Sequence, residues 1–260
     1  SVNIALHALC GGLIYLFIAE FRRQSAGPSR HILGQPLEVW VALLWLLSPM
    51  HVSTVLYTVQ RMTQLSAVFV LLGLWTYLRA RMAYLVAETP SQVRARWLLA
   101  LLACLAMACL SKENGALLPA FWLLLELSLG AHALRCPGPL RALFALCLLL
   151  PVVVAALYLA STHGGFILHG YTARDFDVWG RLLSQVPILL GYVYRTLNPF
   201  APRVFLFGDG FFPMGLSWHD PAFVSAVAVW ALLLSLVWSV RRHAPLVLFG
   251  LAFFAVAHAM

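Results

Sequence analysis

The sequence predicts an all-α fold, a polytopic transmembrane helical bundle with about eight spans and an interfacial amphipathic helix. Hydrophobic residues make up 62% of the 260 positions and charged residues only 10%, whereas soluble domains are nearer half apolar and a quarter charged. Apolar runs recur along the chain, with short polar segments between them. The sequence therefore indicates an integral membrane protein, and we expect membrane lipids around it.

Three regions follow from the order of the apolar runs. Residues 1–160 hold six expected spans, with polar turns at 48–66 and 111–115 on the outer side of the membrane. Residues 161–221 form a long outer loop, and residues 222–260 hold two further spans. In order, the expected spans cover residues 3–18, 37–47, 62–78, 97–110, 115–129, 140–160, 223–240 and 245–257.

The long outer loop contains a helical pattern of apolar residues. They recur at three- or four-residue steps between Val178 and Leu197, with Arg181, Gln185 and Arg195 between them. This pattern predicts an amphipathic helix lying at the membrane interface. A ninth crossing is the alternative, and it would move Arg241 and Arg242 to the outer side.

Positive charges orient the predicted bundle. The net charge is +8, and eleven of the 17 Lys and Arg residues fall in four short loops on one side of it. Because short cytoplasmic loops are enriched in Lys and Arg, these loops should be cytoplasmic. The basic charge thus indicates membrane topology, and we expect no nucleic-acid partner. The outer side is periplasmic if the membrane is a bacterial inner membrane, as we expect.

The first candidate site residue is Arg61, at the outer end of the 62–78 span. Its guanidinium could hold a lipid phosphate through two parallel donors, and Tyr57 lies one helical turn earlier, where it could share the ligand. The alternative is that Arg61 reaches the headgroups without a specific ligand.

Lys112 is the second candidate and the only lysine in the chain. The 97–110 run would span only about 21 Å, which would draw the turn carrying Lys112 below the membrane surface. A buried cation is costly there, and an anionic ligand would relieve the cost. A pair with Glu113, or a lysine at the bilayer edge, is the alternative.

His51, His258 and Asp209 are weaker candidates on the outer side. A histidine can act as a base or a metal ligand, although a lone one is more often a hydrogen-bonded residue at a helix end. Asp209 lies in a glycine-flanked turn, where ligand binding and simple turn chemistry are both open.

The five cysteines lack metal-site spacing and are expected to be small buried residues. The sequence contains no Ser/His/Asp triad, P-loop or dinucleotide fingerprint.

Several short motifs resemble a known family. Residues 3–7 (NIALH), 49–51 (PMH), Arg61 followed by Leu65, and 111–115 (SKENG) occur in order, and 171–183, Asp209 and 253–258 follow. They resemble the GT-C-type membrane glycosyltransferase-like proteins with tetratricopeptide repeats, the bacterial relatives of the transmembrane O-mannosyltransferases. Ser48, Ser53 and Gly208 depart from the pattern of these relatives, so no acid or metal role is carried over to those positions.

The resemblance implies transfer of a sugar from a polyprenyl-phosphate donor to a protein or glycan acceptor on the outer face. It implies that Arg61 and Lys112 bind the lipid phosphate, with His51 and Asp209 as contacts for the acceptor or a metal. It places the acidic catalytic loop before Ser1 and the repeats after Met260. We therefore expect a fragment with no catalytic residue of its own and no covalently bound cofactor; a divalent metal would belong to the full-length protein.

Two other functions stay open at this point. One is a polytopic transporter or lipid-flipping protein, and the other is a non-catalytic membrane scaffold. Transporters usually place broken helices and polar groups near the middle of the bilayer. In this sequence the ionisable residues lie at the ends of apolar runs, which favours a site at the membrane surface.

Overall fold

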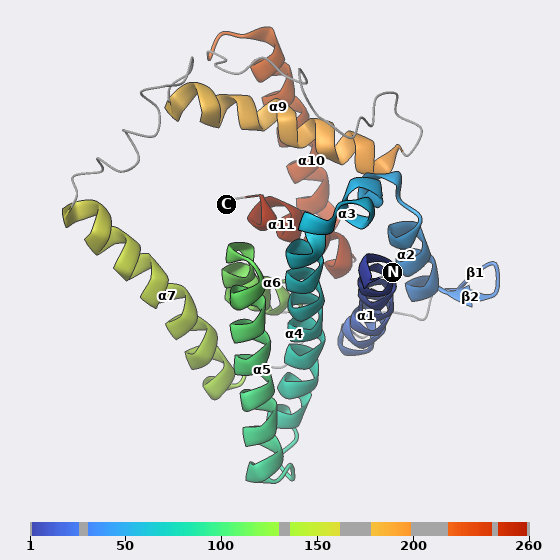
Figure 1. Cartoon of the computed structure of the whole chain (residues 1–260), viewed down its shortest axis with the longest axis vertical. Coiled ribbons are helices and arrows are strands. Elements are labelled where there is room, and N and C mark those ends of the chain that lie inside the picture. Colours follow the sequence, from blue (N-terminus) through green and yellow to red (C-terminus); the bar gives the residue numbers. More distant parts are fainter. Residues whose placement is uncertain are drawn as a thin grey trace. The chain divides into compact units, whose positions relative to one another are not determined.

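The computed structural model describes residues 2–25, 31–129, 136–161, 178–198, 218–240 and 244–258. The described chain is predominantly α-helical, which confirms the predicted all-α class (Figure 1). It divides into two compact units, residues 1–149 with 241–260 and residues 150–240. Each unit is described by itself.

The first unit is a set of helices around one long central helix, α4. A hairpin of two short strands precedes α2, and its two-residue turn has positive φ at Leu33 (51°) and Gly34 (77°), as two-residue hairpin turns require. The elements are α1 (Val2–Gln24), β1 (His31–Ile32), β2 (Gln35–Pro36), α2 (Leu37–Leu46), η1 (Pro49–His51), α3 (Val52–Leu56), η2 (Thr58–Gln60), α4 (Arg61–Leu85), α5 (Ser91–Ser111), η3 (Glu113–Leu117), α6 (Leu118–Leu129) and α11 (Pro245–Ala257).

The core of this unit lies along α4, which packs against α1 and α5. Tyr77 of α4 stacks on Trp122 of α6 with ring centroids 5.7 Å apart. The indole nitrogen of Trp122 donates to the Gly73 carbonyl at 3.2 Å. Leu74 and Leu101 are almost fully buried beside them. The centre of α4 is therefore fixed by close helix packing and one buried hydrogen bond.

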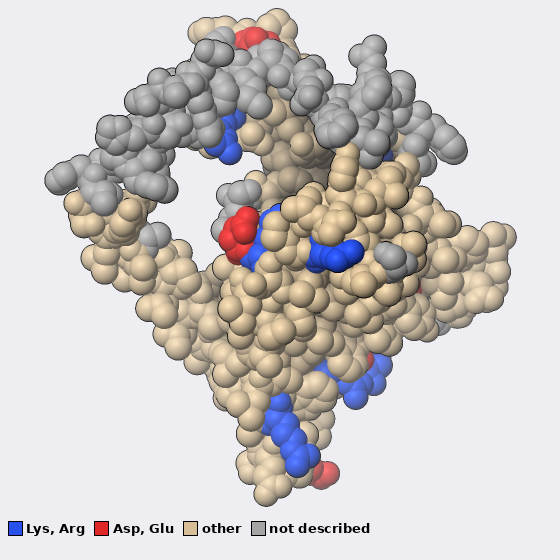
Figure 2. All heavy atoms as spheres, in the orientation of Figure 1, with Lys and Arg blue, Asp and Glu red and all other residues tan. Residues whose placement is uncertain are grey.

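Four ion pairs of the described residues gather at one end of the unit, which we name the Glu126 end. The buried Arg81 side chain donates to the Glu126 carboxylate at 2.8 Å, and Tyr77 donates to the same oxygen at 3.0 Å. Figure 2 shows positive charges close to this end, where α4 gives way to α5. The other three pairs are Arg22–Glu38, Arg23–Glu20 and Arg79–Glu20.

The second unit contains α9 (Val178–Leu197) and α10 (Pro221–Val240), and α7 (Gly138–Ser161) runs across the boundary between the units. The indole of Trp230 on α10 donates to the Val186 carbonyl on α9 at 3.0 Å. The Asp220 carboxylate accepts from the backbone N–H of Ala222 at 3.0 Å, which caps the first turn of α10.

Within the described residues, five helices are long and apolar enough to cross a membrane. A sixth span results if α2 and the η1–α3 segment, which meet at a 45° bend, form one broken crossing. The chain is thus an integral membrane protein, as predicted. The five long spans are Val2–Gln24, Thr58–Leu85, Ser91–Ser111, Gly138–Ser161 and Pro221–Ser239.

The structure corrects the expected length of α5. The helix has 21 residues and begins at Ser91, six residues before the apolar run that we used to place it. It is therefore about 31 Å long, enough to span the bilayer core. Helix length by itself therefore does not draw Lys112 below the membrane surface; its depth stays a prediction, and its contacts describe its environment.

Candidate functional site

Asn3 joins the start of α1 to the broken segment before α4. The side chain is buried, and its amide nitrogen donates to the carbonyls of Val55, at 2.9 Å, and Tyr57, at 3.0 Å. Tyr57 has an extended backbone between α3 and η2, with φ of −82° and ψ of 129°. The amide thus satisfies carbonyls that this break in the helix leaves without intrahelical partners.

The same Asn3 side chain holds Arg61. Its amide oxygen accepts from Arg61 Nε at 2.9 Å. Arg61 is exposed at the first residue of α4 and forms no ion pair with a described residue. Since only Nε is bonded to Asn3, the terminal guanidinium nitrogens keep their donors for another group.

His51 belongs to a cluster of three rings. His7 stacks on Trp45 with centroids 4.7 Å apart, and His51 lies 4.4 Å from Trp45 and 5.4 Å from His7. The His7 Nε2 atom also bonds to the Leu46 carbonyl at 3.0 Å. These contacts fix the turn between α2 and α3 against α1, which gives His51 a packing role in addition to any ligand role.

The turn carrying Lys112 is built on a very close helix contact. Lys112 is extended between α5 and η3, and its carbonyl accepts from the Gly115 N–H at 2.9 Å. A Cβ atom at Gly115 would lie 2.2 Å from the carbonyl carbon of Ala108 on α5. Only glycine allows this approach, so Gly115 sets the path of the turn and the direction of the Lys112 side chain.

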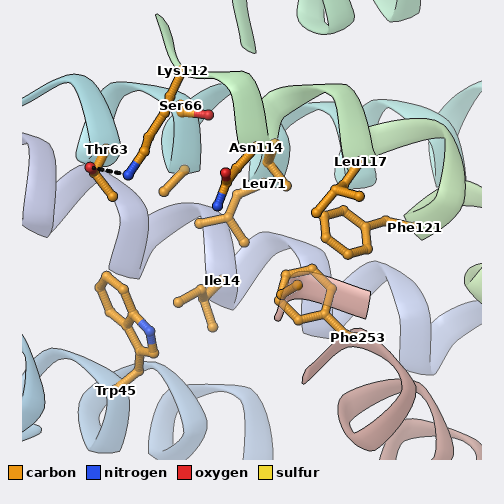
Figure 3. Close-up of a pocket in the computed structure, with 13 residues that line it drawn as sticks. Ile14, Trp45, Thr63, Ser66, Leu71, Lys112, Asn114, Leu117, Phe121 and Phe253 are labelled. Atoms are coloured by element: carbon orange, nitrogen blue, oxygen red, sulfur yellow. Dashed lines mark hydrogen bonds between the residues drawn. The ribbon is translucent and has the colours of Figure 1, made fainter. Parts of the chain in front are cut away.

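Lys112 reaches across to α4. Its ammonium donates to the Thr63 hydroxyl at 3.1 Å and forms no ion pair with a described residue (Figure 3). An ammonium has three donors, so two of them are not used by the described protein groups. The alternative of a pair with Glu113 is not observed; Lys112 has a neutral partner, the Thr63 hydroxyl.

A pocket of about 260 Å³ opens beside Lys112. One wall is polar, and Figure 3 shows the side chains of Lys112, Asn114 and Thr63 along it. The remaining lining is mostly apolar and comes from α1, α2, α4, η3, α6 and α11. Its large side chains are Ile14, Trp45, Val70, Leu71, Leu117, Phe121 and Phe253.

The structure brings most of the predicted polar residues to one end of the first unit. Hydrogen bonds join Asn3 to Arg61 and Thr63 to Lys112, and Trp45 both contacts His51 and lines the pocket. We name this the Lys112 end. Lys112 lines the pocket, whereas His51, Tyr57 and Arg61 do not. Asp209 lies outside the described residues, and His258 bonds to the Phe254 carbonyl at 2.8 Å.

Four important residues were not predicted from the sequence. Thr63, Asn114 and Trp45 line the pocket, and Asn3 holds Arg61. Asn114 carried a usable signal because it lies two residues after Lys112 in a polar turn. Asn3 begins the motif at residues 3–7, but nothing in the sequence links it to Arg61, 58 residues away. Trp45 carried no signal, since its partner His7 lies in another helix.

The described residues contain no group of three or more His, Cys, Asp or Glu side chains that could hold a metal ion. His7 and His51 lie close together, but no carboxylate or thiol completes a set of ligands around them within the described part of the chain. The arrangement at the Lys112 end is instead cationic and apolar, which suits an anionic amphiphile.

In comparisons with known proteins, no family model, no curated protein and no solved structure matches this chain.

Proposed function

We propose that this chain is part of a GT-C-type membrane glycosyltransferase, which moves a sugar from a polyprenyl-phosphate donor to a protein or glycan acceptor on the outer face of a bacterial inner membrane. Lys112 binds the lipid phosphate in this proposal, and Arg61 and Tyr57, both joined to Asn3, lie at the same end of the unit. The acidic base and any divalent metal belong to other parts of the full-length protein.

One observation carries the proposal: the Lys112 ammonium borders a largely apolar pocket, and its described partner is the neutral Thr63 hydroxyl. A cation without a carboxylate partner is costly in a low-dielectric environment, and a phosphate would offset that cost. The apolar lining suits a hydrocarbon chain, which a free sugar or a metal ion does not have.

The pocket volume limits what can enter. A volume of about 260 Å³ is close to nine times the roughly 30 Å³ occupied by a water molecule in the liquid. It therefore accommodates a headgroup and the first carbons of a lipid, while the rest of a long polyprenyl chain stays in the bilayer. Such a partial fit is consistent with a donor that arrives laterally from the membrane.

The proposal includes a topology of eight crossings with α9 at the interface. Five long apolar helices and the broken α2–α3 pair account for six of them. The 3-10 helix η3 and helix α6 together cover Glu113–Leu129, about 28 Å at the usual rise per residue. That segment would supply the seventh crossing. The apolar helix α11, with 13 residues, would supply the eighth.

A lipid transporter is the second candidate function. The 45° bend between α2 and the η1–α3 segment favours it, because transporters often build substrate sites from discontinuous helices. Both functions need Lys112 to bind a lipid phosphate. They differ in the outcome, since a transporter moves the whole lipid and a transferase cleaves the sugar from it.

The test is sugar transfer from a polyprenyl-phosphate sugar by the full-length protein. Lys112→Ala removes a charged hydrogen bond of about 1.5–3 kcal/mol, which corresponds to a loss of roughly 10- to 150-fold in transfer. Arg61→Ala should also reduce transfer. Arg79→Ala is the matched control, because Arg79 is a half-exposed cation at the Glu126 end. The proposal fails if Lys112→Ala and Arg61→Ala both transfer sugar at the wild-type rate.

A further inference from the structure

Asn114 is a polar pocket residue whose side chain bonds to nothing else in the described protein. It lies on η3, half-buried, two residues after Lys112. Its side chain points into the same pocket as that of Lys112 (Figure 3). No hydrogen bond joins its carboxamide to another described residue, although a carboxamide carries two donors and an acceptor with two lone pairs.

A packing role does not account for this side chain. Carboxamides that stabilise a fold do so by bonding to backbone or side-chain groups, as Asn3 does at the same end of the unit. An amide that faces an apolar pocket without such bonds loses hydrogen-bonding energy there unless water or a ligand provides partners. Its position is better explained by a ligand.

Four polar side chains line the pocket, and the Ser66 hydroxyl already donates to the Ala108 carbonyl. The other three can all donate hydrogen bonds to a ligand. Lys112 has two donors beyond its bond to Thr63, Asn114 has two amide donors, and the Thr63 hydroxyl hydrogen is available because its oxygen accepts from Lys112. The wall contains no carboxylate. Several donors around one positive charge match a tetrahedral oxyanion, whose oxygens point in different directions, better than a planar carboxylate.

We propose that Asn114 is a specificity-determining residue, which donates its amide N–H to a second oxygen of the phosphate held by Lys112 and so makes the pocket select a lipid phosphate over a lipid carboxylate. This inference rests on the proposed function for the phosphate. It goes beyond that function because it assigns the choice of headgroup to a neutral residue next to the cation.

The experiment measures binding to the 260-residue chain in lipid nanodiscs by calorimetry, with empty nanodiscs as the blank. Three probes share one apolar body and differ in the headgroup: geranyl phosphate, geranate and geraniol. Inorganic phosphate is the fourth probe and separates a lipid headgroup from a free ion. We expect geranyl phosphate to bind the wild-type chain about tenfold more tightly than geranate, and inorganic phosphate to bind far more weakly than either.

Asn114→Ala is the key variant. Loss of one hydrogen bond should weaken geranyl phosphate binding roughly three- to tenfold and leave geranate binding nearly unchanged, so the preference for phosphate falls. Because Asn114 bonds to no described residue, thermal stability should be unaffected. Asn114→Asp places a negative charge beside the ligand. It should weaken the binding of geranyl phosphate and of geranate, but not the binding of geraniol.

The outcomes separate the inference from the proposal on which it rests. The specificity role of Asn114 is overturned if the Asn114→Ala variant binds geranyl phosphate as tightly as wild type, or if it binds geranyl phosphate and geranate more weakly by the same factor. Lipid-phosphate binding stands in both cases. If Lys112→Ala leaves geranyl phosphate binding unchanged, or if the wild-type chain does not bind it, the proposed function itself is overturned. If inorganic phosphate binds as tightly as geranyl phosphate, the site binds a free phosphate ion, and the inference that the ligand is a lipid is overturned.

Discussion

The close contact at Gly115 gives the sharpest prediction about how the site is built. A Cβ atom at this position would lie 2.2 Å from the Ala108 carbonyl carbon, 2.3 Å from its oxygen and 2.6 Å from the Cys109 nitrogen. Ordinary contacts between such atoms are about 3.5–4.0 Å. Gly115→Ala therefore requires the backbone of η3 to move by more than about 1 Å, because all three neighbours are backbone atoms of α5.

The cost of this movement can be bounded. Overpacking a well-packed site costs about 1–3 kcal/mol, and the better helix propensity of alanine recovers at most about 1 kcal/mol. Together these terms leave a range of about 0–3 kcal/mol, and we expect Gly115→Ala to lower the free energy of unfolding by about 1–2 kcal/mol, near the middle of that range. The displaced turn should also move the Lys112 ammonium away from Thr63 and weaken geranyl phosphate binding.

Unfolding by SDS in mixed micelles, followed by circular dichroism, measures the change in stability. Gly12→Ala is the matched control, since a Cβ atom at Gly12 on α1 meets nothing within 4 Å. That variant should be as stable as wild type or slightly more stable. If Gly115→Ala unfolds at the same SDS fraction as Gly12→Ala, the close approach of η3 to α5 does not exist, and the reasoning about Lys112 loses its basis.

Two further predictions concern buried polar contacts of the first unit. Asn3→Ala leaves two carbonyls without their donor and frees Arg61, so unfolding should be easier by about 1–3 kcal/mol and the same SDS titration measures it; unchanged stability would contradict the hydrogen bonds of Asn3. Arg81→Leu leaves the Glu126 carboxylate buried without its partner and should cost about 3–5 kcal/mol, whereas the double variant with Glu126→Leu should recover much of that loss. A double variant as unstable as the single one would show that the charge itself is not the cause.

The sequence predicted helices well where apolar runs and helix ends coincide. The run at residues 245–257 is an example, because Pro245 begins α11 and Ala257 ends it. The pattern between Val178 and Leu197 also corresponds to an observed helix, α9. Its position at a membrane interface stays a prediction, as do the sides assigned to the loops and the three regions drawn from them.

The pattern failed where a helix continues through charged residues. The α5 helix begins at Ser91, directly after Pro90, and its first turns carry Arg94 and Arg96. These residues were assigned to a loop because apolar periodicity starts only at Trp97. The α4 helix likewise continues past Arg81, which is buried because Glu126, 45 residues away, pairs with it. Local sequence contains no sign of such a partner.

The candidate site was also predictable only in part, because some of its residues depend on partners that are distant in the sequence. Polar turns between apolar runs identify Arg61 and Lys112, and alternation of the spans predicts that both turns lie at one end of the bundle. Thr63 does join the two turns through its bond to Lys112. The roles of Asn3 and Trp45 depend on contacts between distant segments, and those contacts follow from packing geometry that one sequence does not reveal.

The cations at the two ends of the first unit differ in their partners. At the Glu126 end, Arg22, Arg23, Arg79 and Arg81 pair with three carboxylates, those of Glu38, Glu20 and Glu126, which offset most of their charge. At the Lys112 end, the cations Arg61 and Lys112 bond to a neutral amide and a neutral hydroxyl. If the cations at the Lys112 end served only to orient the helices in the membrane, they could all lie at exposed positions facing the lipid headgroups. Lys112 is instead half-buried and borders an apolar pocket, which is where an external anion gains most from a positive charge.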